Sequence, residues 1–145
     1  LGRWEKTKPA GVDFKRVPAV FSADWSLLAQ AFYTAETLGV GAKMHEPLFE
    51  AIHIDRLNLR DEQVLASLFS EHGGITNADF AEAFSAFSVK SRVSQASAKS
   101  RAYGVTGVPT MVVNGKYRVD GQMAGSNEDM LKVVDFLVAK EQAGL

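Results

Sequence analysis

The stretch from Gly104 to Val119, GVTGVPTMVVNGKYRV, constrains the fold more than any other part of the sequence. Asn-Gly between two short apolar runs is a strong β-hairpin signal, because both residues tolerate the positive φ that a two-residue turn requires. We therefore expect hairpin strands over 109–113 and 116–119, joined at Asn114 and Gly115. Pro109 opens the first strand, although proline removes a backbone donor that a sheet could use. These residues alone allow two roles for Pro109: it either opens an edge strand or belongs to a recognition loop.

Helical periodicity dominates the rest of the chain. Alternating apolar and charged residues over 12–21 first predict a strand that leaves its sheet at Pro18. Apolar residues at helical spacing then predict five helices. The first runs from about Asp24 to a stop at Gly39 and Gly41, and the second covers 42–55. The third runs from an Asp61 cap to a stop at Gly73 and Gly74, a short fourth follows a Thr76 cap, and the fifth continues through Tyr103 with Gly104 as its stop. A last helix, capped by Ser126, is expected to bury Met130, Val133, Val134 and Leu137. The fold class is α/β with helices in the majority, and Phe80, Phe84 and Phe87 are assigned to its core.

Composition and charge exclude several classes of partner. The chain has 145 residues and a formal net charge of −1, so it has no global attraction to nucleic acid or anionic lipid. A run without acidic residues between Glu82 and Asp120 holds six cations: Lys90, Arg92, Lys99, Arg101, Lys116 and Arg118. We interpret this run as a solvated helix face balanced by acids elsewhere in space, and we expect no nucleic-acid partner. No apolar run approaches the ~18 residues that a membrane span needs.

Cysteine is missing from the sequence, which excludes a disulfide framework, a thiolate metal site and a cysteine nucleophile in these 145 residues. The three histidines, His45, His53 and His72, lack paired-ligand spacing, so no metal site is expected. No G-x-S-x-G, Walker or dinucleotide glycine pattern is present. The sequence therefore predicts no cofactor.

The loop TGVPT followed by the hairpin NGKY resembles the DsbA family of periplasmic thiol:disulfide oxidoreductases. The resemblance continues through VKSRVSQASAKSRAYGVTGVPTMVVNGKYRV, and the segments VPAVF, PLFEAIH and FSAFSVKS follow in the family's order. It covers nearly the whole chain. It implies a thioredoxin-like fold with an inserted helical domain, here with a partial thioredoxin-like domain over 1–22 and 89–145 and the insertion over 23–88.

The resemblance also implies the site. In the family a cis-proline loop faces the reactive disulfide, so Gly107, Val108 and Pro109 are the expected substrate-binding residues, with the backbone of Val108 pairing with an extended substrate segment. The implied substrates are unfolded secreted polypeptides, the implied location is the periplasm, and the implied reoxidising partner is a membrane protein such as DsbB.

One departure from the family is large. Its reactive Cys-x-x-Cys begins a helix that follows the central strand, whereas the opening LGRWEKTKPAGVDF resembles the tail of that helix running into the next strand. We therefore expect the first strand, the central strand and the redox motif to be missing by truncation, proteolysis or processing, so that no residue of this chain is catalytic. Loss of the central strand exposes backbone groups and apolar faces, which predicts self-association unless the missing piece is supplied in another form.

Two other functions remain open. Kappa-class glutathione transferases and 2-hydroxychromene-2-carboxylate isomerases resemble this fold and can use serine where DsbA has cysteine. The segment NGKYRVDGQMAGSNEDML lacks the tryptophan expected in those isomerases. The other alternative is a non-catalytic peptide-binding module that keeps the cis-proline loop.

Overall fold

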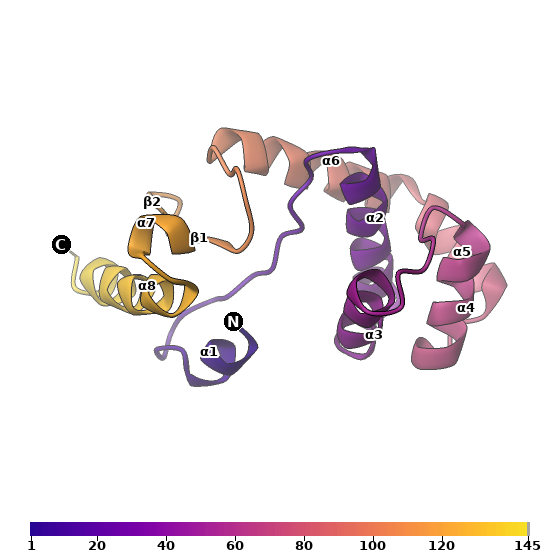
Figure 1. Ribbon diagram of the computed structural model, residues 1–145, viewed down its shortest axis with the longest axis horizontal. Helices are drawn as coiled ribbons and strands as arrows, with labels where there is room; N and C mark the ends of the chain where they lie inside the picture. The colour runs from indigo at the N-terminus through magenta and orange to yellow at the C-terminus, as the bar shows by residue number, and fades with distance from the viewer. Residues whose placement is uncertain (145) are drawn as a thin grey trace. The chain divides into compact units, whose positions relative to one another are not determined.

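The computed structural model describes residues 1–144, and these residues form two compact units. Residues 1–17 and 100–144 make up the first unit, and residues 18–99 make up the second. Figure 1 shows the course of the chain through both units. We predicted that residues 18–22 and 89–99 belong to the partial thioredoxin-like domain over 1–22 and 89–145. In the structure they group with the helical unit, because Val20, Val89, Val93 and Ala96 pack with Ala29 and Tyr33.

The first unit is built on an antiparallel hairpin. Strand β1 (Thr110–Val113) pairs with β2 (Tyr117–Asp120), with Met111 opposite Val119 and Val113 opposite Tyr117. Asn114 and Gly115 have φ of 51° and 67°, and the Lys116 N–H donates to the Val113 carbonyl at 3.0 Å. The turn at Asn114 and Gly115 is therefore confirmed, but the two-residue loop length is wrong: Val113 pairs with Tyr117, so the loop has three residues, Asn114 to Lys116.

Helices α1 (Gly2–Thr7) and α8 (Asn127–Gln142) enclose the core of the first unit together with the hairpin, and the short helix α7 (Gly121–Ala124) follows β2. Trp4 of α1 is buried, and its indole Nε1 donates to Asp135 of α8 at 2.8 Å. The buried members of this core are Trp4, Met111, Val113, Val119, Met130, Val134 and Val138. The outer face of α8 contains Val133, which we had assigned to the buried stripe and which is 37% exposed.

The second unit consists of four helices and most of a fifth. They are α2 (Ala23–Thr37), α3 (Gly41–His53), α4 (Glu62–Gly73), α5 (Asn77–Ser85) and α6 (Phe87–Ala102). The predicted caps of α4, α5 and α8 are confirmed, since the side chains of Asp61, Thr76 and Ser126 each accept a backbone N–H of the following turn. The core contains Met44, Leu65, Phe69, Phe80 and Phe84. None of the helices formed by residues 1–144 has the length and apolar character needed to cross a bilayer.

Two predictions about these elements are wrong. Residues 12–20 form no strand, because no described strand runs beside them to supply ladder hydrogen bonds. The segment nevertheless keeps the predicted alternation, with Val12 and Phe14 turned to the core of the first unit and their neighbours exposed. Phe87, assigned to the core, is 86% exposed at the first position of α6.

Candidate functional site

The candidate site is the loop that connects the end of α6 to β1, residues 103–109. The backbone turns sharply at Gly104, where φ is +62°, a conformation that favours glycine. The Gly104 N–H donates to the Arg101 carbonyl at 3.1 Å, and the Val105 N–H donates to the Ser100 carbonyl at 2.8 Å. These bonds occupy carbonyls left free at the helix terminus, so the beginning of the loop has a defined conformation.

Arg118 of β2 anchors the same end of the loop. Its guanidinium Nη1 donates to the carbonyl oxygens of Tyr103 at 3.1 Å and Gly104 at 2.6 Å. A β-carbon added at Gly104 would lie 2.6 Å from this nitrogen, so the lack of a side chain there lets the guanidinium approach. A cation at carbonyls that follow a helix C-terminus also complements the negative end of the helix dipole. Arg118 therefore connects the hairpin to the loop.

A second contact stabilises the far end of the loop. The Thr110 hydroxyl donates to the Gly107 carbonyl at 2.7 Å, directly across the Val108–Pro109 peptide bond. That bond is cis, in agreement with the family resemblance. Pro109 is half-buried, whereas Val108 is 58% exposed. Among residues 1–144, neither the N–H nor the C=O of Val108 has a hydrogen-bond partner. The arrangement presents the free N–H and C=O of one exposed residue, to which an extended chain can add backbone hydrogen bonds.

Electrostatic contacts fix the hairpin tip at the opposite end of β1. The Glu141 carboxylate of α8 accepts from Lys116 Nζ at 2.8 Å and from Asn114 Nδ2 at 2.7 Å. The hydrogen bond from Lys116, followed by the one from Asn114, lowers the pKa of Glu141, and the same pairing raises the pKa of Lys116. The tip is thereby attached to α8.

Two cations of the basic run are matched by acids distant in sequence, as we expected. Lys116 pairs with Glu141, and Arg92 pairs with Glu36 while its guanidinium lies 4.2 Å from the centre of the Tyr33 ring. Within residues 1–144, no group of three metal-ligating side chains comes together.

The structure brings Gly107, Val108 and Pro109 together in one exposed loop. Sequence reasoning did not identify two residues that shape this loop. Thr110 is adjacent to the proline, where a hydroxyl commonly bonds to nearby backbone, so a signal for it was present. Arg118 lies 14 positions from Gly104, and only the hairpin register brings it there.

Fold and site together define a thioredoxin-like protein with a cis-proline loop and a large helical unit. A model of the DSBA-like thioredoxin domain family matches residues 2–135. The chain belongs to this family.

Named relatives agree with the assignment. The chain is 40% identical over 143 residues to the thiol:disulfide interchange protein DsbA of Azotobacter vinelandii and 41% identical over 140 residues to that of Pseudomonas aeruginosa. These alignments cover 99% and 97% of this chain, and it spans 66% of the length of each relative.

Solved structures show the same fold. The crystal structure of Pseudomonas aeruginosa DsbA superposes with a TM-score of 0.89 at 39% identity, covering 98% of this chain and 73% of that one. A cysteine-to-serine variant of Proteus mirabilis DsbA with a non-covalently bound peptide, PWATCDS, superposes with a TM-score of 0.76 at 26% identity. That match covers 95% of this chain and 76% of the other.

Proposed function

We propose that the protein to which this chain belongs is a DsbA-type thiol:disulfide interchange protein that introduces disulfides into secreted polypeptides. The observation that carries the proposal is the exposed residue Val108, whose backbone N–H and C=O have no partner among residues 1–144, beside a cis proline in a chain of this family. Named relatives at about 40% identity support it.

Thiol–disulfide exchange requires two protein sulfurs in addition to a surface that binds the substrate. A substrate thiolate attacks one sulfur of a protein disulfide to form a mixed disulfide, and a second substrate thiolate then releases the protein as a dithiol. The substrate is oxidised and the protein disulfide is reduced. These 145 residues contain no cysteine, so both protein sulfurs of this step have to come from outside them.

The role proposed for this chain is to hold the substrate. Gly107, Val108 and Pro109 bind an extended polypeptide through the free backbone of Val108, and Arg118 and Thr110 maintain the loop geometry before binding. Preorganisation of this kind lowers the entropy lost on association. We propose that residues 23–88, which lie within the helical unit, correspond to the family's helical insertion. From the family assignment we also propose a periplasmic location and reoxidation by a membrane partner such as DsbB.

The binding role is testable on the chain itself. The peptide PWATCDS is titrated into the ¹⁵N-labelled protein, and amide shifts are expected at 105–108 and at Thr110. Val108→Asp places a charge on the exposed loop and is expected to weaken binding, while Val17→Asp, at a valine that is 45% exposed in the same unit, is the matched control. Shifts confined to other regions, or equal binding by both variants, would contradict the role.

Catalysis is tested on the complete gene product. After oxidation, it is expected to form disulfides in a reduced, unfolded protein faster than buffer alone, and Val108→Asp should slow this reaction more than Val17→Asp does. Saturable glutathione binding without disulfide transfer would support the kappa-class alternative. Peptide binding by a gene product that encodes no cysteine would support the non-catalytic module.

A further inference from the structure

The helical unit contains a pocket of about 300 Å³ between the beginning of α2 and the segment that connects α3 to α4. Its apolar wall consists of Leu27, Leu28, Ile52, Leu57 and Leu59. Its remaining lining residues are polar, namely Asp24, Arg56, Asn58 and Arg60. Small-molecule sites typically combine a mostly apolar wall with a few polar groups, and this volume is at the small end of their range.

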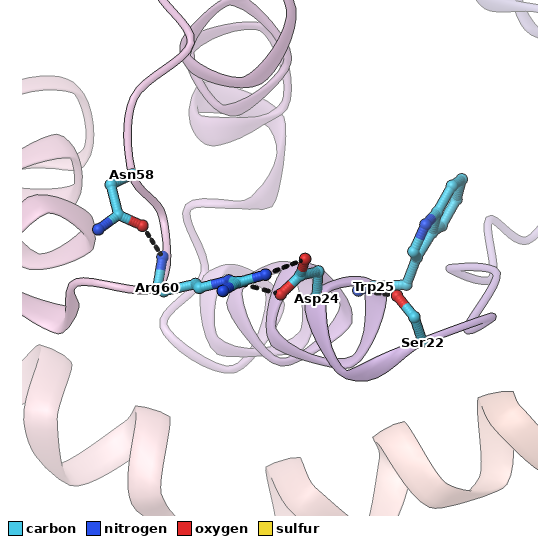
Figure 2. Close-up of polar contacts among 5 residues, drawn as sticks. All are labelled: Ser22, Asp24, Trp25, Asn58 and Arg60. Carbon is cyan, nitrogen blue, oxygen red and sulfur yellow. Dashed lines mark hydrogen bonds and ion pairs between the residues drawn. The ribbon is translucent and has the colours of Figure 1, made fainter.

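A bidentate ion pair joins two polar residues of the lining, Arg60 and Asp24, as Figure 2 shows. Arg60 donates through Nε to one oxygen of Asp24 at 2.7 Å and through Nη2 to the other at 2.6 Å, while its backbone N–H donates to Asn58 Oδ1 at 3.2 Å. The hydrogen bond from Arg60 lowers the pKa of Asp24, so this carboxylate keeps its charge at neutral pH. The connecting segment is thereby attached to α2, and these two charges compensate each other.

Arg56 supplies a charge that no acid in the lining compensates. It forms no ion pair with any residue in the described part of the chain, and the lining as a whole contains two arginines and one aspartate. The Asp61 carboxylate does not line the pocket, and it accepts the Gln63 N–H at the beginning of α4. The pocket therefore combines an apolar wall with one excess positive charge.

We propose that this pocket binds a small monocarboxylate with an apolar tail. The tail covers the leucine and isoleucine side chains, and the carboxylate pairs with Arg56. A carboxylate suits the site because a guanidinium donates two parallel hydrogen bonds to it. A neutral ligand would leave Arg56 uncompensated, and an ammonium would be repelled. The site lies within the helical unit and shares no residue with the loop at Val108.

Three six-carbon probes of different charge test the proposal. Hexanoate, hexan-1-ol and hexylamine are titrated separately into the ¹⁵N-labelled protein at constant ionic strength. We expect saturable amide shifts concentrated at 24–28 and 52–60, with hexanoate binding tightest and hexylamine weakest. Exposed ion pairs contribute modestly, so Arg56→Gln is expected to weaken hexanoate binding about two- to fivefold. Its effect on hexan-1-ol should be negligible.

Lys43→Gln is the control, since it removes an exposed cation of the same unit that does not line the pocket. It should leave all three affinities unchanged. The proposal is overturned if hexanoate gives no saturable shifts in the pocket, if the three probes bind equally, or if Arg56→Gln and Lys43→Gln weaken hexanoate binding by the same factor. Matching spectra of the free variants ensure that a difference reflects the site and not unfolding.

Discussion

Substitution of Gly104 by alanine tests whether the loop is held by Arg118. Alanine at φ +62° costs roughly 1–2 kcal/mol, because its β-carbon crowds the following carbonyl. The same β-carbon would lie 2.6 Å from Arg118 Nη1, so the guanidinium has to move. Loss of its two hydrogen bonds adds about 1 kcal/mol at this exposed position. We therefore expect Gly104→Ala to lower the free energy of unfolding of the first unit by about 2–3 kcal/mol.

A double-mutant cycle separates the two contributions. Arg118→Ala alone is expected to cost about 1 kcal/mol, and the double variant should be about as destabilised as Gly104→Ala, because the same hydrogen bonds are lost only once. The assay is urea unfolding followed by the fluorescence of buried Trp4 in a Trp25→Phe background, which reports the first unit. Strict additivity of the single effects, within about 0.5 kcal/mol, would refute the proposed contact.

Three further perturbations test other parts of the structure. Phe69→Ala removes a buried ring and is expected to destabilise the helical unit by about 3–5 kcal/mol. Phe87→Ala removes an exposed ring and should change the free energy of unfolding by less than about 0.5 kcal/mol. Circular dichroism during urea unfolding measures both effects. The contacts that lower the pKa of Glu141 stabilise the fold at pH values above the ordinary carboxyl range, and this stabilisation is lost as the pH falls through that range. Glu141→Gln should therefore flatten the dependence of the urea midpoint on pH between about 6 and 3. An unchanged slope would contradict the contact with Lys116. Strand β1 pairs only with β2 among the described residues, so light scattering is expected to show concentration-dependent self-association that a Val112→Lys substitution weakens, and a monomer at every concentration would exclude it.

Elements with local signals were predictable from the sequence. The caps at Asp61, Thr76 and Ser126 depend on a side-chain oxygen and an N–H two or three residues away, so a few neighbouring residues determine them. The strand expected over 12–21 was not determined locally. An alternating pattern predicts which side chains turn inward, and the structure keeps that alternation, but a ladder also requires a neighbouring strand.

The candidate site also contains features that neighbouring residues determine and features that depend on distant ones. Its recognition residues are consecutive, so a short motif identifies them, whereas their anchor depends on strand register. Arg118 lies opposite Val112, and a one-residue slip of β2 would turn its side chain to the other face of the sheet. Because the three-residue loop from Asn114 to Lys116 sets that register, it also determines that the guanidinium reaches the Tyr103 and Gly104 carbonyls. The turn at one end of β1 therefore controls the geometry of the loop at the other end. A substitution in the turn should disturb the loop through Arg118, although the substituted residue does not contact the loop.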